Sequence, residues 1–551
     1  MRKKRILFCS EATFLNTGYA TYTREILNYL SSTNKYEIAE LAAYGQPDDP
    51  RISTIPWKFY PAALPKNSSQ EQQRAFASKA TNQFGEYVFE SVCLDFMPDI
   101  VCDIRDFWMM DFIDRSPYRK FFNWCIMPTV DAEPQARQWI ATYETADACL
   151  SYSNWSGDLL QKQSGNKINY IGSAPPSAHP AYRPADNIDE IKNSIGIDKN
   201  WKIVGTVMRN QRRKLYPDLF EAFKLLLEKT KDPDLKLYCH TSYPDMGWDV
   251  PELLQQYKLS SKVLFTYVCT ETNMPFASLF KGAKAESPYT KKLTGVMANV
   301  KQGLTYEQLS DIINTFDVYV QYANSEGFGL PQVEAAACAV PVMSVDYSAM
   351  SSVIRQLGGT PLPVKTFYKE LETGCLRAVP DNDATASLLQ EFFKIPKTMR
   401  NKKGFECRNN FLKHFQWDKS GAEWEKYFDS VELRDVSETW KSPPDIQQSA
   451  PKPDKTPEVS YQEIAYFLIN QVLKLPEKCN EYMFSRTIRD LMYGNVTNMT
   501  GGMYMNECAT AFENTPHRYP FNFDIAYQKM KDIRDNINQW EQRRMEVMSN
   551  R

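Results

Sequence analysis

The chain alternates short runs of β-forming apolar residues with longer segments in which apolar residues recur every three to four positions. The first strand-like run covers residues 5–10, and the first helical pattern covers residues 17–32. Further strand-like runs, separated by helical patterns, lie at residues 36–44, 99–104, 121–130 and 148–153. Alternation of this kind predicts βαβ units and a mostly parallel sheet.

The same alternation begins again after a proline-rich crossing at residues 173–186. We therefore expect an α/β protein with two Rossmann-like doubly wound domains facing a cleft, followed by a mainly helical C-terminal extension. We expect an N-terminal domain at residues 1–180 and a C-terminal ligand-binding domain at residues 181–395. Helices at residues 396–435 return to the first domain, and a Pro- and Lys-rich linker at residues 436–460 leads to the helical extension at residues 461–551.

Composition narrows the classes of protein. A length of 551 residues is too great for one core, and 43% hydrophobic with 24% charged residues is ordinary for a globular protein. The net charge of −2 predicts no overall attraction to nucleic acid or to an anionic membrane. The sequence shows neither a signal-peptide core nor an apolar run of about 20 residues, so we expect a cytoplasmic protein, in its own cell or in a host, without a membrane span. Twelve scattered cysteines and four histidines predict reduced thiols and no metal site.

One stretch, residues 324–342, carries the most chemistry. Glu326 and Glu334 flank a glycine-containing turn, and the strand-like run at residues 317–323 precedes it. The turn opens a predicted helix, so its free N–H groups suit an anion such as a diphosphate. The two carboxylates would instead meet hydroxyl groups, and a nucleotide sugar offers both kinds of partner. The alternative is a surface turn with ordinary acids at a helix start.

A basic turn follows the strand predicted at residues 201–210. Arg209 and Lys214 lie at its carboxyl end, where two cations form a clamp for a pyrophosphate. Arg212 and Arg213 between them are interpreted as a solvated turn.

Together, residues 205–214, 325–342 and 341–346 resemble the retaining glycosyltransferases of family 4, which have the B-type glycosyltransferase (GT-B) fold. The resemblance extends over residues 5–430. It implies that Arg209 and Lys214 contact the donor diphosphate, that Glu326 contacts the transferred sugar, and that Glu334 binds the ribose hydroxyls.

The remaining donor-side candidates lie in the first loop, in a later strand and in the glycine turn. They are Gly18, Tyr267, Val268, Gly327, Phe328, Gly329 and Leu330. For Gly18, a plain strand-to-helix turn is the alternative.

The sequence also departs from the family pattern. A histidine that the family often carries after the strand at residues 99–104 is missing, and Asp103 and Arg105 are the candidates in that neighbourhood. The segment 270–303 is longer than a simple turn. We interpret it as a mobile, solvated insertion or, alternatively, as a basic flap over an anionic acceptor. Its lysines are Lys281, Lys284, Lys291, Lys292 and Lys301.

The resemblance implies a metal-independent, retaining transfer from a nucleotide-diphosphate sugar, which serves as co-substrate, with no further cofactor. The leaving phosphate would accept the proton of the attacking hydroxyl. The acceptor stays open: a saccharide, lipid or small molecule, or a modified base in DNA. The remaining alternative is a non-catalytic protein that binds a sugar nucleotide. The oligomeric state is not predicted.

Overall fold

The computed structural model describes residues 2–299, 302–434 and 443. Apart from Pro443, the linker expected at residues 436–460 and the helical extension expected at residues 461–551 lie outside the described residues.

The N-terminal half forms a seven-stranded parallel sheet with the order β3-β2-β1-β4-β5-β6-β7. Its strands are β1 (Lys4–Glu11), β2 (Tyr36–Ala43), β3 (Lys58–Pro61), β4 (Ile100–Asp103), β5 (Asn123–Ile126), β6 (Ala148–Ser151) and β7 (Tyr170–Ser173). Strand β1 is buried along residues 6–10, as expected for a parallel sheet covered by helices on both faces. The strand order reverses between β1 and β4, where doubly wound sheets bind ligands.

Helices connect these strands. They are α1 (Gly18–Thr33), α2 (Gln70–Ala77), α3 (Glu86–Phe96), α4 (Phe107–Met110), α5 (Phe112–Arg115), α6 (Arg137–Glu144) and α7 (Asn154–Ser164), with 3₁₀ turns at Pro50–Thr54, Ala80–Phe84 and Arg119–Phe121. Helix α1 starts after Thr17, whose side chain accepts a hydrogen bond from the Ala20 amide and so caps the helix.

The second half repeats the plan in a nine-stranded sheet. Its strands are β8 (Lys202–Val207), β9 (Leu235–His240), β10 (Val263–Cys269), β11 (Pro275–Leu279), β12 (Lys284–Ala285), β13 (Gly295–Met297), β14 (Val318–Gln321), β15 (Val342–Val345) and β16 (Thr360–Leu362). The parallel part runs β10-β9-β8-β14-β15-β16, so the order reverses between β8 and β14. Two such domains confirm the predicted α/β architecture.

The helices of this half are α8 (Ile188–Ser194), α9 (Tyr216–Thr230), α10 (Val250–Gln256), α11 (Tyr306–Asn314), α12 (Leu330–Ala337), α13 (Ser348–Leu357), α14 (Asn382–Lys394), α15 (Lys397–His414) and α16 (Trp417–Ser430). A two-stranded antiparallel pair, β17 (Val364–Lys369) and β18 (Leu376–Pro380), follows β16. In the described part of the chain, no helix is long and apolar enough to cross a bilayer.

The segment 270–303 corrects one expectation. Its described residues form β11 and β13, which pair antiparallel with β10, and β12, which pairs with β13. Phe276 is buried there and stacks on Tyr267 at 5.7 Å between ring centroids. The insertion is therefore an ordered extension of the sheet, because it buries apolar side chains of its own. Its described lysines, Lys281, Lys284, Lys291 and Lys292, are exposed.

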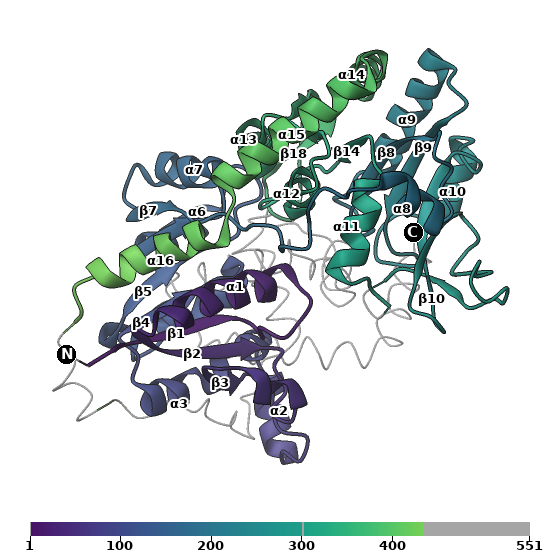
Figure 1. Ribbon diagram of the computed structural model, residues 1–551. Coiled ribbons are helices and arrows are strands. Elements are labelled where there is room, and N and C mark those ends of the chain that lie inside the picture. Colours follow the sequence, from purple (N-terminus) through teal and green to yellow (C-terminus); the bar gives the residue numbers. More distant parts are fainter. Residues whose placement is uncertain (1, 300–301, 435–442, 444–551) are drawn as a thin grey trace, which may run out of the picture. The chain divides into compact units, whose positions relative to one another are not determined.

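The last described helix returns to the first domain. Helix α16 lies against α1 (Figure 1). Its Trp424 is fully buried, and the indole Nε1 donates to the Tyr22 hydroxyl at 3.0 Å. At the surface of the same contact, the Tyr29 hydroxyl donates to Glu425 at 2.8 Å. The helix thus ties the end of the second domain to the first.

Candidate active site

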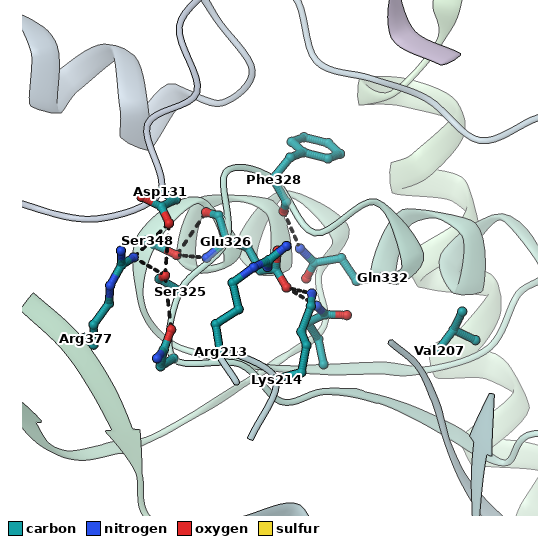
Figure 2. Close-up of polar contacts among 12 residues, drawn as sticks. Asp131, Val207, Arg213, Lys214, Ser325, Glu326, Phe328, Gln332, Ser348 and Arg377 are labelled. Carbon is teal, nitrogen blue, oxygen red and sulfur yellow. Dashed lines mark hydrogen bonds and ion pairs between the residues drawn. The ribbon is translucent and has the colours of Figure 1, made fainter. Parts of the chain in front are cut away.

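The loops that follow β8 and β14 meet where the strand order of the second sheet reverses. Lys214 forms a β-bridge with Ala323, so the two loops are held side by side. The Lys214 ammonium donates to Glu326 Oε1, and Arg213 donates to Glu326 Oε2 at 2.7 Å (Figure 2). The Gln321 side-chain amide is the third donor to this carboxylate and binds Oε1 at 3.1 Å. The structure therefore joins a basic turn and an acid that lie more than 100 positions apart in the sequence.

Burial differs within this group. The Lys214 and Glu326 side chains are 8% and 7% exposed, whereas that of Arg213 is 42% exposed. Burial and the neighbouring guanidinium of Arg213 lower the pKa of Lys214 well below its usual value. A buried carboxylate must be paired, which is why Glu326 turns toward these cations. In this structure both oxygens of Glu326 are engaged by these partners, and its predicted contact with the transferred sugar stays a prediction.

The roles predicted for the basic turn are also redistributed. Arg209 forms a bidentate pair with Asp245, at 2.9 and 3.0 Å, instead of joining Lys214. This pairing lowers the pKa of Asp245 to about 2. Arg213, interpreted from the sequence as part of a solvated turn, is the residue that stands beside Lys214 at Glu326. Nothing in the charged run distinguishes Arg213 from Arg212, because the pairing depends on how the loop folds.

The glycine turn between the two acids is closely packed. Gly329 has φ +84° and precedes the first residue of α12, so a side chain there would be strained. A Cβ on Gly327 would lie 2.6 Å from the Thr129 methyl group of the first domain. Phe328 is 7% exposed and packs edge-on against Phe415, with 5.9 Å between ring centroids. At Gly327 the turn thus brings its main chain close to the N-terminal domain.

Two hydrogen-bond pairs hold the turn in place. The Ser348 hydroxyl accepts from the Glu326 amide at 2.9 Å and lies 3.1 Å from the Glu326 carbonyl, to which it donates. The Gln332 side-chain amide donates to the Phe328 carbonyl at 2.9 Å (Figure 2). Leu330 is the first residue of α12 and is partly buried. The backbone N–H groups of the turn are consequently preorganised.

Glu334 lies one turn further along α12 and is partly buried. Burial raises the pKa of its carboxyl to about 7, although a hydrogen bond with the Tyr182 hydroxyl lowers it in part. Tyr182 comes from the crossing between the domains, which the sequence analysis did not connect with a site. Near neutral pH this carboxyl therefore exists in both protonation states.

Replacing Glu334 with Gln should make stability less dependent on pH. Because the folded-state pKa is raised from 4.5 to about 7, the stability tied to the bound proton is fully present below pH 4.5 and is lost as pH rises through about 7. Thermal melting at pH 5 and pH 8 measures this. From pH 5 to pH 8, the free energy of unfolding of Glu334→Gln should rise relative to that of the wild type by about 1 kcal/mol or more. Equal pH dependence of the two proteins would contradict the assignment, and the exposed Glu391→Gln serves as control.

The remaining donor-side candidates are Gly18 of α1 and Tyr267 and Val268 of β10. Gly18 is exposed at the first position of α1. Tyr267 and Val268 are 0% and 1% exposed in β10, and the Tyr267 hydroxyl donates to the Gly282 carbonyl and accepts from the Lys281 amide, at 2.8 and 2.9 Å. Side-chain contacts of Tyr267 and Val268 with a donor are therefore not supported, because both are covered by the antiparallel extension of the sheet.

Asp103 and Arg105, the candidates in the first domain, form a closed ion pair. Both are fully buried, and Arg105 grips the Asp103 carboxylate at 2.6 and 2.8 Å. Arg105 also donates to the Phe84 carbonyl. Burial leaves no atom of the pair open to an acceptor, so their prediction as catalytic residues is corrected to a structural role.

Asp106, the next residue in this loop, was not among the site residues predicted from the sequence. Asp106 accepts a hydrogen bond from the Tyr19 hydroxyl at 2.7 Å, and that hydroxyl lies 2.6 Å from the hydroxyl of Thr129. Nearby, Arg377 of β18 donates to Asp131 at 2.8 Å and links the two domains (Figure 2). An acid directly before a short helix, after a strand that ends at a sheet's switch point, was the available signal for Asp106.

Within residues 2–299 and 302–434, no group of three or more His, Cys, Asp or Glu side chains is arranged to hold a metal ion.

Comparison with known proteins extends this picture. Residues 282–403 match the family model of glycosyl transferases group 1. No curated protein matches the sequence significantly.

Three similar solved structures illustrate the fold. Sucrose-phosphate synthase from Thermosynechococcus elongatus shares 15% identity, with a TM-score of 0.56 over 78% of this chain and 98% of its own. The E. coli trehalose-6-phosphate protein bound with UDP-2-fluoro glucose shares 12%, with a TM-score of 0.52 over 78% of this chain and 100% of its own. HepE from Anabaena in complex with UDP and glucose has the same identity, TM-score and coverages.

These likenesses and the two doubly wound sheets establish the GT-B fold. With a group 1 domain over residues 282–403 on that fold, the chain is a glycosyltransferase.

Proposed function

We propose that the protein transfers a sugar from a nucleoside-diphosphate sugar to a hydroxyl acceptor, without a metal and with retention of anomeric configuration, as its resemblance to family 4 implies. The observation that carries this proposal is the meeting of Lys214, Arg213 and the glycine turn at the switch point of the second sheet.

The chemistry of the donor explains the arrangement. Breaking a glycosyl-phosphate bond places negative charge on the leaving diphosphate, and fixed cations and N–H groups on that side lower the barrier. Lys214 and Arg213 supply cations, while the turn from Gly327 to Leu330 supplies main-chain donors that are already in place. Glu326 orients both cations in the absence of a donor. A metal is not needed to neutralise the diphosphate if these cations do so.

Given retention, the state of Glu326 favours front-face attack over a covalent intermediate. Both of its oxygens are occupied by cations, which makes the carboxylate a poor nucleophile for a covalent intermediate. We propose front-face attack: the bond from the acceptor oxygen to the sugar carbon forms as the bond to the phosphate oxygen breaks. The acceptor's proton then passes to that phosphate oxygen.

Arg209 and Glu334 complete the proposed donor site. Arg209 reaches a diphosphate only by leaving Asp245, so its contribution should be smaller than that of Lys214. Glu334 on α12 binds the ribose hydroxyls. Because solved GT-B proteins of this shape hold UDP or a UDP-sugar analogue, uridine donors are the first to test.

The wild-type protein should release a nucleoside diphosphate from at least one sugar donor. Mass spectrometry after incubation with UDP-, GDP-, ADP- and dTDP-sugars, with and without EDTA, measures this directly. We expect EDTA to leave the rate unchanged, and NMR of the first-formed product to show the donor's anomeric configuration. Loss of turnover in EDTA that added Mg²⁺ restores would refute metal independence, and inverted product would refute retention.

A further inference from the structure

The first sheet carries its own switch point, and Asp106 lies there. Strand β1 ends at Glu11 and β4 ends at Asp103, and the loop after β4 places Asp106 immediately before α4. The proposed donor group occupies the corresponding place in the second sheet, after β8 and β14. Ligands of doubly wound sheets bind at such points, so Asp106 is placed for a ligand on the other side of the reaction.

A short chain of contacts links Asp106 to the donor turn. The Tyr19 hydroxyl stands between the Asp106 carboxylate, at 2.7 Å, and the Thr129 hydroxyl, at 2.6 Å. Thr129 in turn faces Gly327, where an added Cβ would lie 2.6 Å from its methyl group. Arg213 interacts electrostatically with both Asp106 and Tyr19. These contacts therefore connect Asp106 with the turn that is proposed to bind the donor.

The groups around Asp106 are hydroxyls, carboxylates and two cations that already have partners. Tyr19 of α1 and Thr129 after β5 are hydrogen-bonding neighbours. Burial, with the Asp131 and Glu11 carboxylates, raises the pKa of Asp106 to about 6. Arg213 is bound to Glu326, and Arg377 is bound to Asp131. A phosphate group on the acceptor would face the Asp106 and Glu11 carboxylates with no neighbouring cation among the described residues left to pair with it, which is unfavourable.

An aromatic side chain borders the same place. Tyr44, just after β2, is 43% exposed, and the Glu11 and Asp106 carboxylates raise the pKa of its phenol in addition to burial. Its backbone has φ +61°, a conformation that is rare for a bulky residue and that tends to occur at functional sites. An exposed ring beside carboxylates suits a sugar, which offers an apolar C–H face and hydroxyl donors.

We propose that Asp106 is the acceptor-positioning residue, which accepts a hydrogen bond from a hydroxyl of the acceptor, and that the acceptor is an uncharged saccharide resting against Tyr44. This rests on the proposed function. It narrows the acceptor to a neutral polyol and disfavours DNA and sugar phosphates.

The test uses the full chain and a donor that the wild type turns over. Glucose, fructose and maltose are offered as acceptors, together with glucose 6-phosphate and fructose 6-phosphate, and the products are identified by mass spectrometry. We expect each neutral sugar to exceed its phosphate ester at least tenfold in kcat/KM. Asp106→Ala should lower kcat/KM for the acceptor at least 30-fold, mainly through KM, while the Kd for the nucleoside diphosphate changes less than twofold.

Two further variants separate positioning from folding. Asp106→Asn keeps an acceptor oxygen and should recover part of the loss, whereas Asp158→Asn, an exposed control on α7, should behave as the wild type. Preference for the phosphate esters, failure of all three neutral sugars as acceptors, or unchanged acceptor kinetics in Asp106→Ala would overturn the inference and leave the transferase proposal standing. A wild type that turns over no donor would overturn both.

Discussion

Lys214→Ala should reduce the rate of sugar transfer on the order of 100-fold to 1,000-fold, the usual effect of removing one fixed donor to a developing anion. The ammonium is buried next to the glycine turn, and a cation in a buried site interacts more strongly with a diphosphate than a solvated one does. Most of the loss should appear in kcat, measured by release of the nucleoside diphosphate under saturating donor.

Two comparisons keep this prediction specific. Lys214→Arg retains the charge and should recover part of the rate. Arg209→Ala should lose less than about tenfold, because that guanidinium is 48% exposed and screened by water, whereas Lys214 is 8% exposed. Removing Lys214 leaves Glu326 buried beside Arg213 alone, so melting temperatures must show that the variant is folded. Folded Lys214→Ala with wild-type turnover would contradict the site.

Arg105→Ala should destabilise the first domain by about 3–5 kcal/mol, because it strands the fully buried Asp103 carboxylate without a partner. Urea denaturation followed by circular dichroism measures the loss. Because the pair directly precedes Asp106 in the chain and anchors that segment, activity should fall together with stability.

The matched control is Arg115→Ala. Arg115 pairs with Asp111 at 2.6 Å on the surface, with its side chain 61% exposed, so its loss should cost less than about 1 kcal/mol. Similar costs for the two variants would show that the burial of the Asp103–Arg105 pair contributes nothing.

Much of the fold follows from local patterns. The buried run of β1 and the amphipathic α1 are set by neighbours in sequence, and repetition of the βαβ pattern after residue 186 was enough to predict two doubly wound domains. The glycine turn was predictable for the same reason: Gly329 is required by its positive φ at the start of α12.

The pairing of charges was not predictable in the same way. Whether Arg209 or Arg213 stands beside Lys214 depends on the path of the loop at residues 208–215 and on Asp245, which lies 36 positions from Arg209. Asp103 and Arg105 were in the right loop but point into the core, while Asp106 faces Tyr19 of α1. The antiparallel strands after β10 were missed because they are 5, 2 and 3 residues long, too short to carry a clear periodicity.

The most direct test of the account is whether nucleoside diphosphates bind at Lys214. A ligand that binds only the folded protein raises its melting temperature, with about 2.7 kcal/mol of stabilisation at 100 times Kd. At millimolar concentration, at least one of UDP, GDP, ADP and dTDP should raise the melting temperature of the wild type, while the matching nucleoside does not, and the rise should be largely lost in Lys214→Ala. A rise of the same size in both proteins, or none with any diphosphate, would contradict the proposed donor site.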